Sequence, residues 1–269
     1  MTKEFIEFKK ERDLGSIITD AFKFIRLEGK PFLITILKTA IIPIVIAVVA
    51  MMYYMISMSS LSTDGVNGGI GVFISSILLL VAYLLAFVFI NLAGMHYIQS
   101  YIDNNGVVNQ EEIKQNTKDR FWSFTGFGFL SGIIMFISLL LCVFPMFYTW
   151  TVLSLGASVL VFENQSATST IGRCFDFIKG HFWETLGVVF VVSLLVGVLG
   201  YIFQIPATIY QIIKMGIGLN SQDPTEVFSL FSDPIYLILN VVSIVGQLMF
   251  YSITLITNVF LYFDINEQK

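Results

Sequence analysis

The chain has 269 residues and a formal net charge of −4, with 56% hydrophobic and only 13% charged residues, whereas an ordinary soluble domain carries about 25% charged residues. This composition argues against a soluble domain, because the apolar residues lie in blocks long enough to cross a hydrocarbon layer, which takes roughly 20 helical residues. The acidic balance also argues against a nucleic-acid partner, since no basic face interleaved with aromatic residues is found.

In chain order, six apolar segments are predicted to cross the membrane. The apolar block over residues 122–162 is too long for one span and holds two, with the turn expected near residues 145–150. The predicted spans are residues 32–56, 70–95, 122–144, 149–162, 185–205 and 235–263. The sequence therefore predicts an all-α polytopic membrane protein, a bundle of six transmembrane helices.

The positions of the Lys and Arg residues predict the orientation, because these residues stay on the cytoplasmic side. Of the 15 Lys and Arg residues, Lys38 lies inside the first span and Lys214 on the opposite side. The others precede the first span, lie in the second-to-third and fourth-to-fifth connections, or end the chain. We expect a multi-pass protein of a bacterial inner membrane, with residues 1–30 and 264–269 in the cytoplasm and residues 31–263 forming the membrane domain. The charged N-terminus predicts no cleaved signal.

Amphipathic segments precede several spans on the cytoplasmic side. Residues 16–26 read SIITDAFKFIR and residues 169–179 read STIGRCFDFIK, with apolar residues at helical spacing. Residues 109–122 form a weaker third case. We predict cytoplasmic interfacial helices and internal repeats, each an interfacial helix followed by two spans. On the far side, DPTEVFSLF over residues 223–231 predicts a short capped helix.

Polar side chains inside the predicted spans mark the candidate site. Lys38 is the only charge in the first span; it either extends to the headgroups or lines a polar groove. The sixth span carries a seam of polar residues on one helical face, which either makes interhelical hydrogen bonds or lines a substrate pathway. The seam comprises Asn240, Ser243, Gln247, Tyr251, Thr254 and Asn258. The candidate polar cavity joins Lys38 to Asn240, Ser243, Gln247, Thr254 and Asn258.

No metal, catalytic or cofactor site is expected. Neither His96 nor His181 has a Cys, His or carboxylate at metal-ligand spacing, so no metal site is predicted. No nucleophile elbow, phosphate loop or dinucleotide fingerprint is found, so we expect neither a catalytic site nor a cofactor. Cys142 and Cys174 are expected at opposite membrane faces as free thiols.

Two motifs carry a resemblance. The amphipathic helix of residues 16–26, followed by a span and later by VFENQS and a second such helix ending KGHFW over residues 161–183, resembles a group of uncharacterised six-span bacterial membrane proteins. That group includes the membrane domain found beside some glycerophosphodiester phosphodiesterases. The resemblance implies the six-span architecture and carries no established activity.

These observations together predict a non-enzymatic integral membrane protein. We expect a scaffold or accessory subunit of a membrane or envelope complex, with membrane lipids and other membrane subunits as partners and no nucleic acid. The alternative is a transporter, flippase or insertase with a polar intramembrane cavity.

Overall fold

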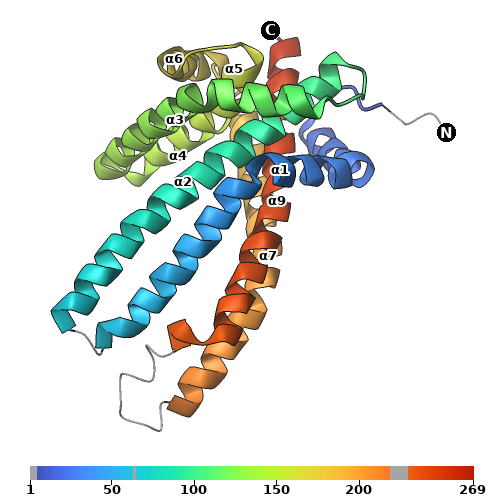
Figure 1. The fold of residues 1–269 in the computed structure, drawn as a ribbon. Helices are drawn as coiled ribbons and strands as arrows, with labels where there is room; N and C mark the ends of the chain where they lie inside the picture. Colours follow the sequence, from blue (N-terminus) through green and yellow to red (C-terminus); the bar gives the residue numbers. More distant parts are fainter. Residues whose placement is uncertain (1–4, 63–64, 219–229) are drawn as a thin grey trace. The chain divides into compact units, whose positions relative to one another are not determined.

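The computed structural model describes residues 5–62, 65–218 and 230–269, and in these ranges all regular structure is helical (Figure 1). Six stretches of this helical structure are long and apolar enough to cross a membrane. They are α1 Leu14–Ser59, α2 Gly65–Asp103, α3 Gln110–Leu141, α4 Val143–Ser154 together with α5 Gly156–Phe162, α7 Phe182–Gly218 and α9 Pro234–Glu267. Shorter elements are η1 Ser60–Ser62, α6 Ala167–Phe177 and η2 Leu230–Ser232. The predicted all-α, polytopic architecture is confirmed: the chain is a multi-pass integral membrane protein.

Helix α1 is longer than predicted, because the segment 16–26 and the span 32–56 form one continuous helix. The predicted boundary after residue 30 therefore lies inside a helix rather than between two elements. Pro31 and Pro43 both lie within α1. Helices of membrane proteins tolerate proline where neighbouring groups satisfy the freed backbone carbonyls.

Helix α3 likewise joins a predicted interfacial segment to its span. Asn109 caps its N-terminus, since the Asn109 side chain accepts hydrogen bonds from the backbone N–H groups of Glu111 and Glu112. These two carboxylates also lie where the positive end of the helix dipole favours them. The segment 109–122 is thus the first part of a long helix rather than a separate one.

Helix α6 is the predicted interfacial segment that stands alone. Ser166 and Ser169 form a reciprocal capping box at its start. Its buried residues include Cys174 and Phe177, and the helix packs against α3, α4 and α5 (Figure 1). The apolar face of α6 therefore covers other helices of the protein.

The turn between the third and fourth spans comes earlier than predicted. The break is at Cys142, whose backbone is extended, and α4 begins directly after it. Pro145 lies in the first turn of α4. Backbone N–H groups in a first turn have no acceptor within the helix, so proline, which lacks an N–H, loses no hydrogen bond there. The expectation of a turn at residues 145–150 was wrong because this proline starts a helix instead of ending one.

Helix α7 continues beyond the predicted end of the fifth span at residue 205, through Pro206 to Gly218. Most of the far-side helix predicted over residues 223–231 lies outside the described residues; Leu230 and Phe231 belong to η2.

The chain divides into two compact units. Unit 1 comprises residues 1–39, 88–196 and 251–269, and unit 2 comprises residues 40–87 and 197–250. The core of unit 1 is rich in aromatic side chains, among them Phe8, Phe24, Phe32, Tyr97, Tyr101 and Phe260. The core of unit 2 includes Met55, Ala207, Leu230, Tyr236 and Leu237. The internal repeats stay a prediction.

Candidate functional site

In unit 2, the predicted seam on α9 meets a glutamine of α7. Gln247 Nε2 donates to Ser243 Oγ at 2.9 Å and to Gln204 Oε1 at 3.4 Å, and Ser243 Oγ donates to the same Gln204 oxygen. A Cβ at Gly246 would collide with the ring of Phe203, so the two helices approach closely beside this cluster. Asn240 instead bonds within its own helix, to the carbonyl of Tyr236.

In unit 1, the seam continues with bonds to α2, α4 and α5. Tyr251 Oη donates to Asn91 Oδ1 on α2 at 3.0 Å. Asn258 Nδ2 donates to the carbonyl of Ser154 on α4 at 3.1 Å, and the Asn258 carbonyl accepts from Ser158 Oγ. Such bonds contribute about 0.6 kcal/mol each on average in membrane helices. They join α9 to its neighbours.

The six residues of the predicted cavity are divided between the units. Lys38, Thr254 and Asn258 belong to unit 1, whereas Asn240, Ser243 and Gln247 belong to unit 2. The Lys38 side chain is exposed, and no carboxylate of the described residues lies within ion-pair distance of it. The cavity between Lys38 and the seam stays a prediction.

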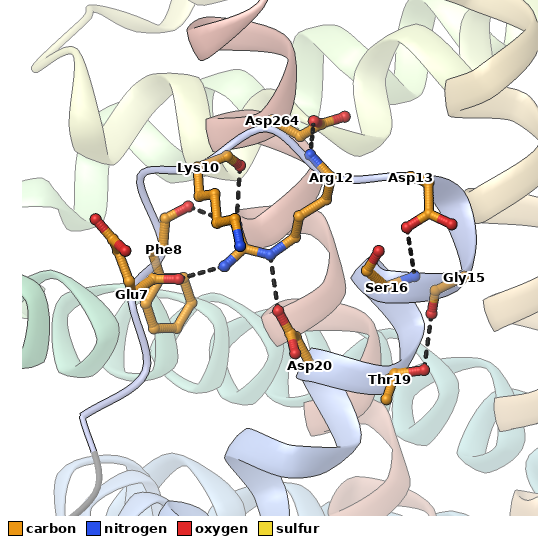
Figure 2. A network of polar contacts seen from close by, with 10 residues as sticks. All are labelled: Glu7, Phe8, Lys10, Arg12, Asp13, Gly15, Ser16, Thr19, Asp20 and Asp264. Atoms are coloured by element: carbon orange, nitrogen blue, oxygen red, sulfur yellow. Dashed lines mark hydrogen bonds and ion pairs between the residues drawn. The ribbon is translucent and has the colours of Figure 1, made fainter.

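A second polar centre surrounds Arg12, which precedes α1 (Figure 2). The Arg12 guanidinium donates to the backbone carbonyls of Glu7, Phe8 and Lys10 and to the carboxylate of Asp20, the last at 2.9 Å. The side chain is only 4% exposed. Because charge-assisted bonds are about twice as strong as neutral ones, Arg12 fixes the path of residues 5–13, which we call the N-terminal strap.

The N-terminal strap is also fastened to the C-terminal part of α9. The Arg12 backbone N–H donates to Asp264 Oδ1 at 2.6 Å, and its guanidinium lies 4.7 Å from the ring centre of Phe260. Phe8 stacks on Phe260 with ring centres 4.2 Å apart, and the hydroxyl oxygen of Tyr101 on α2 accepts a hydrogen bond from the Ile6 N–H. Both ends of the described chain thus join one aromatic core.

A third centre joins the end of α5 to the second half of α6. Arg173 Nε bonds to both carboxylate oxygens of Glu163, at 2.8 and 3.1 Å, and Tyr262 Oη donates to Glu163. The hydrogen bond to Glu163 raises the pKa of Arg173 above its usual range. Burial raises the pKa of the Cys174 thiol to about 12, so Cys174 is a small apolar group at neutral pH.

The last polar centre, in unit 2, joins the beginning of α9 to α7. Tyr210 Oη donates to Asp233 Oδ2 at 2.8 Å, and Lys214 Nζ lies 3.4 Å from the same oxygen and over the Tyr210 ring. Asp233 Oδ1 accepts the N–H of Ile235, which makes Asp233 a helix cap. The hydrogen bond from Tyr210 lowers the pKa of Asp233 below its usual range.

Histidine and cysteine chemistry is limited to local contacts. His96 Nδ1 pairs with Gln99 at 3.0 Å, and His181 lies 3.5 Å from the Glu184 carboxylate. Within residues 5–62, 65–218 and 230–269, no three His, Cys or carboxylate side chains cluster as metal ligands would. Cys142 and Cys174 are free thiols, as predicted.

Sequence reasoning missed the Arg12 centre altogether. Its partners are backbone carbonyls, which carry no sequence signature, and an aspartate 252 positions away. A weak signal existed, since Asp20 follows Arg12 eight positions later, but the sequence alone does not distinguish Arg12 from the neighbouring exposed lysines.

Comparisons of the chain with protein families, with curated proteins and with solved structures find no match.

Proposed function

We propose that the protein is a non-enzymatic scaffold or accessory subunit of a membrane or envelope complex. The observation that carries the proposal is the use of the α9 seam. Ser243 and Gln247 bond to Gln204, and Asn258 bonds to Ser154 and Ser158. Polar side chains that form hydrogen bonds to neighbouring helices stabilise a helical bundle. A scaffold protein needs such a stable bundle.

The proposal extends to the membrane and the orientation. Trp122 and Trp183 each follow a phenylalanine, at or just before the start of a predicted span, and are 79% exposed, as expected of side chains in an interfacial aromatic belt. With the Lys and Arg distribution, they favour a bacterial inner membrane with both termini in the cytoplasm. We also propose kinship with the six-span proteins that the VFENQS and KGHFW motifs resemble.

Purification in mild detergent tests the scaffold role. A tagged protein should recover a membrane partner in constant ratio, and Gln204→Leu should reduce both the recovery and the stability of the bundle. The matched control is Thr208→Val, which changes an exposed polar side chain of the same helix that bonds only to a carbonyl of that helix. Recovery of a monomer without partner, together with solute flux in vesicles, would contradict the proposal.

A transporter, flippase or insertase is the second candidate, and the observation that favours it is exposure. Gln247 and Lys38 are both exposed although they lie in membrane helices. Under this alternative, replacing Lys38, Asn240 and Gln247 with leucine abolishes transport while the fold is retained. Unchanged function of those variants would remove the alternative.

A further inference from the structure

The exposed face of α1 carries three cations that the rest of the described protein does not neutralise. Arg26, Lys30 and Lys38 are all exposed. In the described ranges none of the three forms an ion pair. Arg12 differs, since its guanidinium bonds to four oxygen acceptors and lies over the ring of Phe260, all in unit 1.

The carboxylates of this part of α1 are engaged on other faces. Asp20 bonds to Arg12, and Glu28 is buried and accepts the hydroxyl of Tyr97 at 3.1 Å. Between residues 14 and 39 the sequence contains no other Asp or Glu. The exposed face therefore presents positive charge alone.

The same helical face becomes apolar within one turn. Ile34 and Leu37 are 38% and 39% exposed and follow Arg26 and Lys30 at steps of four and three, so they share a face. Exposed Phe22 and Leu27 flank the cations. Because α1 is one continuous helix, lipid around Ile34 and Leu37 brings its headgroups to the level of Lys30.

Lys38 joins this set through helix geometry. It lies eight residues, or about 12 Å, beyond Lys30 along the axis. In an α-helix the Cα–Cβ bonds tilt toward the N-terminus, so the Lys38 stem leans back toward Lys30 and toward the nearer membrane surface. A lysine ammonium on a flexible stem and the planar fork of an arginine both bind phosphate well.

We propose that Arg26, Lys30 and Lys38 on the exposed face of α1 form a binding site for the headgroup of an anionic phospholipid. The phosphate is held between Lys30 and Lys38, Arg26 one turn further toward the N-terminus adds positive charge beside the headgroup, and the acyl chains lie along Ile34 and Leu37. A free phosphate would not use those apolar side chains, and an acidic protein would not need Lys38 at membrane depth. The site goes beyond the scaffold role and stands without it.

Native mass spectrometry of the detergent-purified full chain tests the site, with phosphatidylglycerol and phosphatidylethanolamine of equal acyl chains as probes. The wild type should retain phosphatidylglycerol preferentially. The triple variant Arg26→Gln, Lys30→Gln, Lys38→Gln should lower that retention at least about tenfold, because each cation beside an anionic surface contributes a factor of about five. Excess inorganic phosphate should leave the bound lipid in place.

Two further variants separate a site from general charge. Lys9→Gln, Lys10→Gln, Lys114→Gln removes the same charge from exposed lysines elsewhere in unit 1 and should retain the lipid. Arg26→Lys, Lys30→Arg, Lys38→Arg keeps the charge and should retain it as well. All variants should share the thermal midpoint of the wild type, since the changed side chains are exposed.

Several results would overturn the proposal. They are equal retention of the two lipids by the wild type, equal loss in the control triple variant, and displacement of the lipid by inorganic phosphate. Release of an acidic protein by the Gln triple variant, without any lipid preference, would replace the lipid by a protein partner. Loss of a complex partner with intact lipid binding would instead bear on the scaffold role alone.

Discussion

The cations of this protein fall into two groups that differ in what neutralises them. Arg12, Arg173 and Lys214 each have a carboxylate and an aromatic ring at hand. Arg26, Lys30 and Lys38 have no ion-pair partner among the described residues. A cation in a membrane protein is thus either paired with groups of the fold or left exposed, where it interacts with the membrane surface.

Helix direction explains why two lysines of membrane helices belong to different groups. Side chains lean toward the N-terminus of their helix. Lys38 lies in the first part of the membrane segment of α1 and leans toward the near surface, whereas Lys214 lies near the end of α7 and leans into the membrane. Lys214 therefore needs Asp233 and Tyr210, and Lys38 does not.

The largest loss of unfolding free energy is expected from Arg12→Met. The change leaves three backbone carbonyls and the Asp20 carboxylate without their donor in a nearly closed site, which costs about 3 kcal/mol of unfolding free energy. Unfolding by a denaturing detergent measures the loss. Lys10→Met, an exposed neighbour, should change stability by less than about 0.5 kcal/mol. Equal effects of the two variants would show that the strap is not fastened by Arg12.

A smaller loss of unfolding free energy is expected from Glu163→Gln. The variant removes the charge that holds Arg173 and weakens the acceptor of Tyr262, and because Arg173 is partly exposed the loss is about 1 kcal/mol. The same unfolding assay measures it, with Glu267→Gln at the exposed end of α9 as control. A Glu163 variant as stable as the control would move Arg173 out of the neutralised group.

Asp233→Asn should have a smaller effect still, visible in its pH dependence. The folded pKa of Asp233 lies below its usual value, so the carboxylate stabilises the folded state above the unfolded pKa of about 3.9. That contribution is lost as the pH falls through the folded pKa. Asparagine retains the helix cap and isolates the charge. The wild type should lose more stability on acidification than the variant; parallel pH profiles would contradict the pairing with Lys214.

The smallest effect is expected from Lys38→Met, which removes no ion pair and should alter stability by less than about 0.5 kcal/mol. Lys214→Met is the matched change in the other group and should destabilise the protein more. If the order is reversed, Lys38 has a partner inside the protein, as the predicted groove requires.

The number of spans could be predicted from sequence because long apolar blocks have few alternatives in water. Their boundaries could not, since the fifth span was predicted to end before Pro206, although this proline lies inside α7. In a bilayer the freed carbonyls find partners on neighbouring helices, which a local pattern does not reveal. The turn at Cys142 was missed for the related reason that Pro145 begins a helix.

The candidate site, like the spans, could be predicted only in part. Spacing along one helix placed Ser243, Gln247 and Asn258 on a seam, and the structure finds hydrogen bonds along it. The partners on other helices, Gln204 and Asn91, could not be predicted because nothing in the spacing of one helix indicates its neighbour.

Cysteine accessibility along α1 tests the central claim that, on its exposed face, lipid begins between Lys30 and Ile34, so that Lys38 lies within it. Single cysteines at Arg26, Lys30, Ile34 and Leu37, in a chain with Cys142→Ser, are treated in intact membranes with a reagent that reacts only in water. The account predicts rapid labelling at positions 26 and 30 and protection at positions 34 and 37. Rapid labelling at all four positions would contradict it.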